Sequence, residues 1–260
     1  MPFAQKLILT FSPLVLCLVM IVISVISAVS GIFIMRRSIP HKKLKIHNDI
    51  AGPLFSTVGV IYAVLVGFIV VVTWQSFDRA NLDTQREANC VMDLYTDAGS
   101  FPVPVKIELR SLIGKYTKAV VKEEWKTIAW GQASPVAGEA LEKIWKFYAG
   151  YTPETITQEV FFRESIQKLN QLDEFRLMRI MDSRHGIHPI LWMVLITGAA
   201  VTVAFSFFFG SENLGSQIAM TVLLTIVIVL ILFTILELDY PFSGGISIRP
   251  DAFQYILNRG

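Results

Sequence analysis

Two histidines near the third apolar segment have a type and spacing that could bind a metal ion. His185 and His188 lie three positions apart, a spacing that can place two imidazoles on one helix face, where they could bind a metal ion. Gly186 and Pro189 surround them, and no third ligand is evident nearby. The alternative is an interfacial loop that leads into a helix whose first turn accepts Pro189. We favour this alternative and expect no metal site.

Four polar residues at the ends of apolar segments are candidate helix-terminus or ion contacts. Glu237 and Asp239 follow one such segment and could bind a cation such as Ca²⁺, although we favour a solvated helix end. Asn48 and Asp49 precede another segment and can cap its N-terminus. A helix N-terminus also attracts anions, but the carboxylate of Asp49 would oppose an anion there.

A stripe of small residues runs along the segment after Asn48 and Asp49. Its members are spaced four, three, four and four positions apart: Gly52, Ser56, Gly59, Ala63 and Gly67. Small stripes let membrane helices approach closely. Alternatively, copies of this helix surround an axis and line a pore, where aromatic rings form constrictions that gate by dewetting. The candidate pore-lining residues are therefore Ser56, Gly59, Tyr62, Ala63, Gly67, Phe68 and Trp74.

The remaining motifs favour neither an enzyme nor a pump. The chain has no G-x-S-x-G, no phosphate-binding glycine loop and no H-E-x-x-H, so we expect no enzymatic activity and no cofactor. Proton-coupled pumps and secondary transporters usually carry ionisable residues inside their spans, and the apolar segments here have none. Uncharged spanning segments are compatible with passive conduction of ions, and they are equally compatible with simple packing of helices.

Composition indicates an all-α integral membrane protein with four spans. Of the 260 residues, 53% are hydrophobic and only 17% are charged. Segments 7–35, 51–74, 190–209 and 218–236 contain no Asp, Glu, Lys or Arg, and each is close to the ~20 residues that cross a bilayer. The first segment is longer than the hydrophobic part of a signal peptide, so cleavage is the less favoured alternative. The net charge of +2 does not indicate a nucleic-acid partner.

The pattern of helix signals predicts four regions. They are the first two spans at 1–76 with a basic loop at 36–47, a helical extramembrane domain at 77–187, spans three and four at 188–238, and a tail at 239–260. The second span should continue unbroken from the bilayer into the extramembrane domain over 49–98, a length of roughly 75 Å. Further helices are expected at about 105–130, after Ser134-Pro135, and from Thr152-Pro153 to about Ser183.

The sequence leaves open which side of the membrane carries the extramembrane domain. The loop at 36–47 holds five basic residues and therefore prefers the cytoplasm. The loop at 210–216 has no Lys or Arg, although it would share the side of that basic loop. The two observations favour opposite topologies.

Several motifs resemble those of a bacterial membrane family described as bestrophin-like. The resemblance covers roughly residues 46–257. It rests on His47-Asn48-Asp49-x-x-Gly52, Gly59-x-x-Tyr62-Ala63-Val64-Leu65-x-Gly67-Phe68, Trp74-x-x-Phe77, Glu87-Ala88-Asn89, Leu94-Tyr95, Leu238-Asp239-x-Pro241-Phe242-Ser243-Gly244 and Pro250-x-x-Phe253.

This resemblance implies a function that composition alone does not give. Bestrophins are pentameric anion channels with four spans per subunit, in which the second span lines the pore. The implied protein is a chloride-conducting homo-oligomer in the bacterial inner membrane, whose partners are the lipid bilayer, its own copies and small inorganic anions. The acidic run that binds Ca²⁺ in animal bestrophins is missing after Asp239, so Ca²⁺ gating is not expected. The alternative function is a non-conducting anchor or sensor whose helical domain binds a partner.

Overall fold

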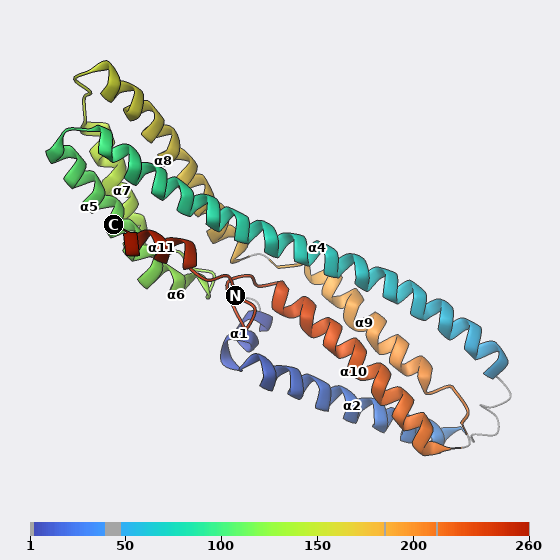
Figure 1. Ribbon diagram of the computed structural model, residues 1–260. Coiled ribbons are helices and arrows are strands. Elements are labelled where there is room, and N and C mark those ends of the chain that lie inside the picture. The colour runs from blue at the N-terminus through green and yellow to red at the C-terminus, as the bar shows by residue number, and fades with distance from the viewer. Residues whose placement is uncertain (1–2, 40–47, 185, 212, 260) are drawn as a thin grey trace. The chain divides into compact units, whose positions relative to one another are not determined.

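The computed structural model describes residues 3–39, 48–184, 186–211 and 213–259, and within them every regular element is helical (Figure 1). The chain divides into two compact units. Residues 10–75 and 187–239 form what we call the membrane unit, and residues 1–9, 76–186 and 240–260 form the helical unit. Most of the basic loop, residues 40–47, lies outside the described residues, as does His185.

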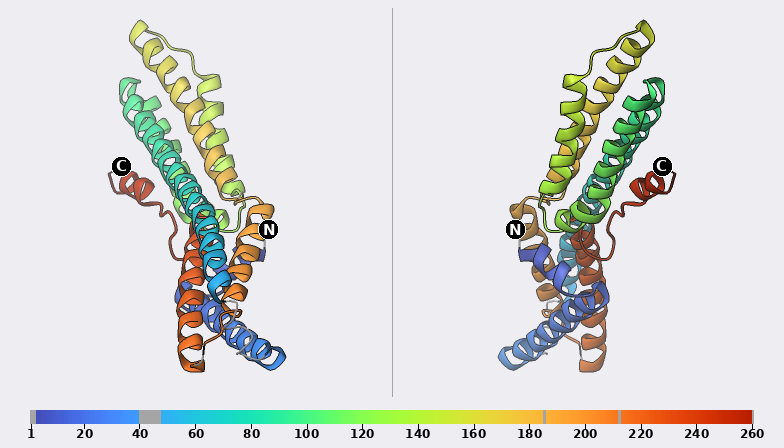
Figure 2. Two further views of the ribbon diagram at one scale, coloured as in Figure 1. Left: turned by 90° about the vertical axis from the view of Figure 1, so that its right-hand side faces the viewer. Right: turned by 90° about the vertical axis from the view of Figure 1, so that its left-hand side faces the viewer.

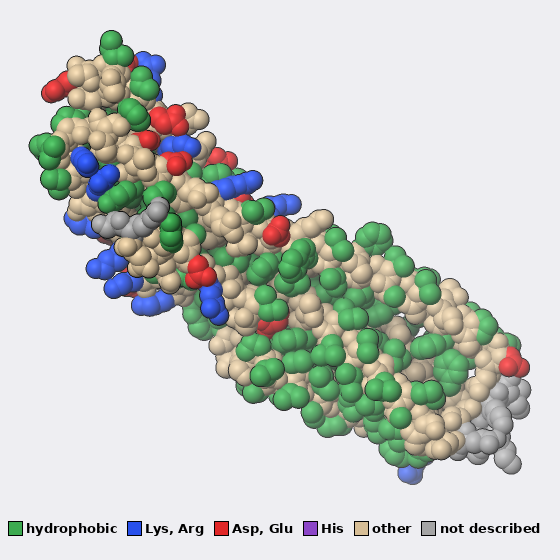
Figure 3. Space-filling model, viewed as in Figure 1, with side chains coloured by type: hydrophobic (Ala, Val, Ile, Leu, Met, Phe, Trp, Pro, Cys, Tyr) green, Lys and Arg blue, Asp and Glu red, His purple; other side chains and the backbone are tan. Residues whose placement is uncertain are grey.

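Four helices of the described chain are long and apolar enough to cross a bilayer. They are α2 (Pro13–Ser38), α4 (Asn48–Asp97), α9 (Pro189–Ser206) and α10 (Leu214–Leu238). Hydrophobic side chains cover much of the surface of the membrane unit, as a surface in contact with lipid requires (Figure 3). The prediction of an integral membrane protein with four spanning helices is confirmed.

The first span begins later than the charge-free run at 7–35 indicated. A short helix, α1 (Phe3–Thr10), ends before it, and α2 starts at Pro13. The Ser12 hydroxyl accepts a hydrogen bond from the Val15 N–H at 3.4 Å, and Pro13 occupies the first helical position. A serine cap followed by proline begins a new helix even within an apolar run. At its other end, α2 includes Arg36 and Arg37, which we had assigned to the basic loop.

Helix α4 continues without a break from the membrane unit into the helical unit, as predicted. It runs over Asn48–Asp97 and is followed by a 3₁₀ turn, Ala98–Ser100. Its one internal proline, Pro53, lies near the N-terminus of the helix, where the missing N–H and the ring disturb only the first turns. No glycine or proline occurs between Gly67 and Gly99, so nothing in the sequence interrupts the helix where it leaves the membrane.

The helical unit is built from the extramembrane part of α4 and the helices that follow it. These are α5 (Val103–Ala119), a π-turn (Val120–Glu124), α6 (Trp125–Ile128), α7 (Pro135–Gly150), α8 (Ile156–Asp182) and α11 (Asp251–Arg259). In Figure 2, α8 lies beside α7, whereas α5 lies with α4 on the other side of the unit. One continuous apolar core joins α4, α5, α7, α8 and α11.

The start of α8 corrects the sequence prediction. Thr152 does not cap this helix, which begins three residues after Pro153, at Ile156. Thr155 is the cap, because its hydroxyl accepts from the Gln158 N–H at 3.2 Å. The Gln158 side chain reaches back and accepts from the Glu154 N–H at 2.9 Å. This pair resembles a capping box, except that Gln158 bonds to the residue before the cap, and it satisfies two backbone donors where a Thr cap alone satisfies one.

The two ends of the described chain both join the helical unit. The Gln5 side chain is 1% exposed, and its amide donates to the Ala129 carbonyl at 3.1 Å and to the Ser243 hydroxyl at 3.3 Å. From the tail, the Ile248 carbonyl accepts from the Trp125 indole N–H at 3.1 Å, and Phe253 is fully buried. The helical unit therefore combines three stretches of chain that the membrane spans separate.

Candidate functional site

The small residues of α4 line an open groove in the membrane unit. The groove has a volume of about 700 Å³ and is bounded on its far side by apolar residues of α10, among them Leu224, Val227 and Ile231. Its α4 wall contains Ser56, Gly59, Ala63 and Gly67. A Cβ added at Gly59 or Gly67 would meet no atom within 4 Å. Within the described subunit, these glycines therefore do not serve close helix packing.

Tyr62 makes the close contact that the glycines of α4 do not. Its ring lies against Gly198 of α9, where a Cβ would come within 2.6 Å of the ring. Its hydroxyl donates to the Leu195 carbonyl at 3.1 Å. Tyr62, a predicted pore-lining residue, thus joins α4 to α9 inside the subunit.

A second stripe of α4 is left uncovered by the rest of its own unit. Val60, Val64, Phe68 and Val71 are 63%, 54%, 69% and 52% exposed. Their spacing of four, four and three positions places them on one helix face. Phe68 was a predicted pore residue and Val60 and Val64 were not, because sequence spacing does not reveal which face the neighbouring helices cover. Trp74, another candidate, is 56% exposed near the end of the span.

The residues at the start of α4 make a different contact from the predicted cap. The Asn48 side chain accepts from the Gly210 N–H and donates to the Gly210 carbonyl, both at 3.0 Å. The one side-chain amide thereby satisfies both the N–H and the carbonyl of Gly210 and holds the segment between α9 and α10 in place. Asp49 is exposed.

The acidic residues at the end of α10 are buried, so the solvated helix end that we favoured is wrong. Glu237 and Asp239 are 1% and 6% exposed. The Asp239 carboxylate accepts from the Ile187 N–H at 2.6 Å and from the Trp192 indole N–H at 3.1 Å. Asp239 thus fixes the chain that enters α9 against the end of α10, a role within the membrane unit.

The histidine pair does not form a described metal site. His188 caps α9, because its Nδ1 accepts from the Ile190 N–H at 3.3 Å. The described residues hold no group of three His, Cys, Asp or Glu side chains placed to bind a metal ion. His185 lies outside the described residues.

A family model described as the bestrophin-like domain matches residues 22–253. This match includes the whole of α4, α9 and α10, most of α2, and residues 76–186 and 240–253 of the helical unit. The chain belongs to the bestrophin-like family. The resemblance seen in the sequence motifs is therefore confirmed.

Solved structures of bestrophin homologues have the same fold. A variant of the bacterial bestrophin homologue from Klebsiella pneumoniae aligns with a TM-score of 0.70 and 12% identity, over 92% of this chain and 98% of that one. A second structure of the Klebsiella pneumoniae homologue aligns at 0.65 with 13% identity, over 92% and 96% of the two chains. No curated protein matches the sequence.

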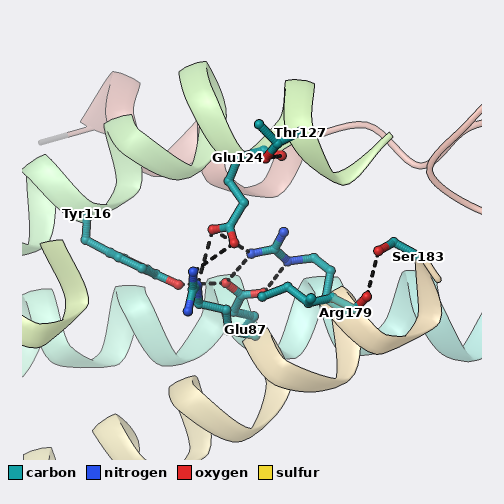
Figure 4. A network of polar contacts seen from close by, with 8 residues as sticks. Glu87, Tyr116, Glu124, Thr127, Arg179 and Ser183 are labelled. Atoms are coloured by element: carbon teal, nitrogen blue, oxygen red, sulfur yellow. Dashed lines mark hydrogen bonds and ion pairs between the residues drawn. The ribbon is translucent and has the colours of Figure 1, made fainter. Parts of the chain in front are cut away.

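The bestrophin-like chain also buries a cluster of charged residues that the sequence prediction missed. In the helical unit, Arg179 of α8 donates through Nε and Nη2 to both carboxylate oxygens of Glu87 of α4 (Figure 4). The Tyr116 hydroxyl donates to the same carboxylate at 2.8 Å. Arg176 makes two bonds to Glu124 at 2.9 and 3.2 Å, and Arg179 lies 3.6 Å from that second carboxylate. The two cations and two anions balance.

The surroundings of Arg179 keep its buried guanidinium charged. Burial alone would lower the pKa of Arg179, but the carboxylates of Glu87 and Glu124 more than offset this and raise it. The guanidinium lies 5.1 Å from the ring centre of Trp125 and 6.0 Å from that of Phe253, which supplies cation–π attraction. The Glu87-Ala88-Asn89 motif was the available signal, because Glu87 lies between the core positions Thr84 and Val91.

Proposed function

We propose that this bestrophin-like protein is a passive ion channel that conducts small anions such as chloride as a homo-oligomer. The observation that carries the proposal is the uncovered stripe Val60, Val64 and Phe68 on α4. No charged residue occurs in α4 between Asp49 and Asp78, so the stripe lies on an uncharged stretch of helix. An apolar stripe on a spanning helix can form one wall of a hydrophobic constriction.

One stripe cannot enclose a conduction pathway, so the proposal requires several copies around an axis. A ring of copies places the same stripe on every side of that axis and stacks rings of valine and phenylalanine along it. The resemblance to bestrophins favours five subunits and selection of anions. We place the protein in the bacterial inner membrane on the same basis.

The measurement that tests conduction is the reversal potential of the purified protein in a planar bilayer under a KCl gradient. Reversal near the chloride equilibrium potential is the expected result. Reversal near the potassium value would retain the channel and overturn anion selection. A well-folded oligomer that passes no current at varied pH and voltage would overturn the channel, and a non-conducting anchor would take its place.

The Phe68→Ala variant tests the constriction directly. Removing the ring should widen the narrow part of the pathway and raise single-channel conductance about twofold or more, because the dewetted length shortens. Phe33→Ala is the matched control, since Phe33 of α2 is 52% exposed on another span. Unchanged conductance in Phe68→Ala, or an equal change in both variants, would remove Phe68 from the pathway.

A further inference from the structure

The helical unit has two opposite outer faces, formed by α5 and by α8. Contacts run around the unit from α4 to α5 through Glu87 and Tyr116, and back from α8 to α4 through Lys168 and Asp93, whose ion pair is 2.9 Å long. Helix α7 packs between α5 and α8. In Figure 2, both views show α5 and α8 on different sides of the unit. Their solvent-exposed faces therefore point in different directions.

The face of α5, the π-turn and α6 is basic. Its exposed lysines lie three, four and four positions apart: Lys115, Lys118, Lys122 and Lys126. Of these four lysines, only Lys126 has an ion pair with another described residue, at 4.0 Å from Glu123. Figure 3 shows Lys and Arg side chains gathered along the edge of the unit that carries α5 and α6. We call these four residues the lysine face.

The outer face of α8 is acidic with an apolar border. Its exposed acids are Glu159, Glu164, Asp173 and Glu174, against one exposed arginine that is already paired with Glu159. Asp173 and Glu174 have no ion pair within the described chain. Beside them, Leu177 and Met178 are 52% and 38% exposed. Exposed apolar side chains rimmed by charge are typical of a protein interface.

We propose that the lysine face of one copy docks on the acidic face of α8 of the next copy. The proposal deepens the proposed function and rests on its homo-oligomer. Because the two faces differ and lie on different sides of one unit, each copy can use both at once, and this head-to-tail contact forms a ring when its rotation closes. Pairing identical faces would instead set lysine against lysine, which charge repulsion disfavours. The apolar border supplies contact area, and the charges fix partner and register.

Cross-linking between copies measures this contact directly. Copies carrying Lys118→Cys and copies carrying Glu174→Cys, with different affinity tags, are expressed together and treated in membranes with a short bis-maleimide. A mixed dimer that joins the two tags is the expected product. Lys143→Cys with Glu174→Cys is the control, because Lys143 is exposed on α7, outside both faces. No mixed dimer, or equal amounts with the control pair, would overturn the proposal.

Charge reversal with rescue provides a second readout. Two sets of substitutions should each lower the fraction cross-linked between Cys variants at Lys126 and Glu164 about tenfold, because like charges then face each other. The first set is Lys115→Glu, Lys118→Glu and Lys122→Glu, and the second is Asp173→Lys with Glu174→Lys. Combining all five substitutions restores opposite charges and should restore the cross-link between Cys variants at Lys126 and Glu164. Failure of the combined variant to recover, with each set still folded by circular dichroism, would contradict the pairing.

The outcomes separate this contact from conduction. An assembled protein with the cross-link but without current retains the contact and overturns the channel. A conducting oligomer without the cross-link retains the channel and overturns the contact. Wild-type protein that is monomeric by light scattering overturns both. Loss of binding to anionic lipid vesicles in the lysine variants, without any cross-link, would show that the lysine face meets lipid headgroups instead.

Discussion

The membrane unit and the helical unit hold their helices together by different means. In the membrane unit, single aromatic rings lie on glycines, as Tyr62 does on Gly198 and Phe207 does on Gly31. In the helical unit, a continuous apolar core surrounds paired charges such as Arg179 and Glu87. Lipid tails are as apolar as the side chains, so burial alone does not drive spans together, and shape decides their packing. Water outside the bilayer makes burial itself the driving force.

This difference explains why one unit leaves its surface open and the other does not. The apolar surface of α4 can remain uncovered, because lipid or another copy can contact it without exposing it to water. The helical unit must close its core and pair every charge that it buries, since an unpaired buried charge is costly. We therefore expect substitutions in the helical unit to act through charge and those in the membrane unit to act through shape.

The largest effect should come from breaking the buried charge pair. Arg179→Met leaves the Glu87 carboxylate buried without its cation and should destabilise the protein by about 3–5 kcal/mol. Arg163→Met removes an exposed pair with Glu159 and should cost less than about 1 kcal/mol. Chemical denaturation in detergent, followed by near-ultraviolet circular dichroism, measures both. Equal losses would show that the buried network does not stabilise the helical unit.

A smaller effect should follow from filling the glycine contact in the membrane unit. Gly198→Ala places a methyl group against the Tyr62 ring and should cost about 1–3 kcal/mol, as overpacking does. Gly59→Ala, on the open groove, meets no atom and should be neutral or slightly stabilising, because alanine favours helix. The thermal midpoints of both variants in detergent test this contrast. A loss at Gly59 as large as at Gly198 would mean that the groove is filled in the assembled protein.

The smallest effect concerns a half-buried acid of the helical unit. Burial, with help from Asp93 and Glu164, raises the pKa of Asp97. Because the folded state then holds the proton more tightly than the unfolded chain, stability should fall as pH rises from the usual value of 3.8 through the raised pKa. Asp97→Asn should flatten this part of the stability profile, whereas Asp78→Asn, at an exposed site, should not. A profile unchanged by Asp97→Asn would contradict the assignment.

The sequence predicted best what depends on composition and local signals. The four spans and the unbroken α4 followed from apolar length and from the lack of glycine and proline after Gly67. The start of α8 was wrong because Thr152-Pro153 is a good local signal, yet the Thr155 and Gln158 pair satisfies more backbone groups. Where two caps compete within four residues, sequence spacing does not decide between them.

The candidate site was harder to predict because it depends on partners far along the chain. Tyr62 and Phe68 have similar surroundings in the sequence, but Gly198 gives one of them a place inside the subunit and leaves the other exposed. In the same way, Asp239 looks like part of a solvated helix end until the chain before α9 packs on it. Residue types at the site were predictable, but the directions of their side chains were not.

The helical unit is made of three separate stretches of chain, and this has a consequence for biosynthesis. Residues 76–186 are synthesised before the third and fourth spans, and Phe253 is synthesised after both. Until that residue arrives, the buried guanidinium of Arg179 lacks one of its two aromatic covers. The helical unit therefore cannot complete its core until both of these spans have been synthesised.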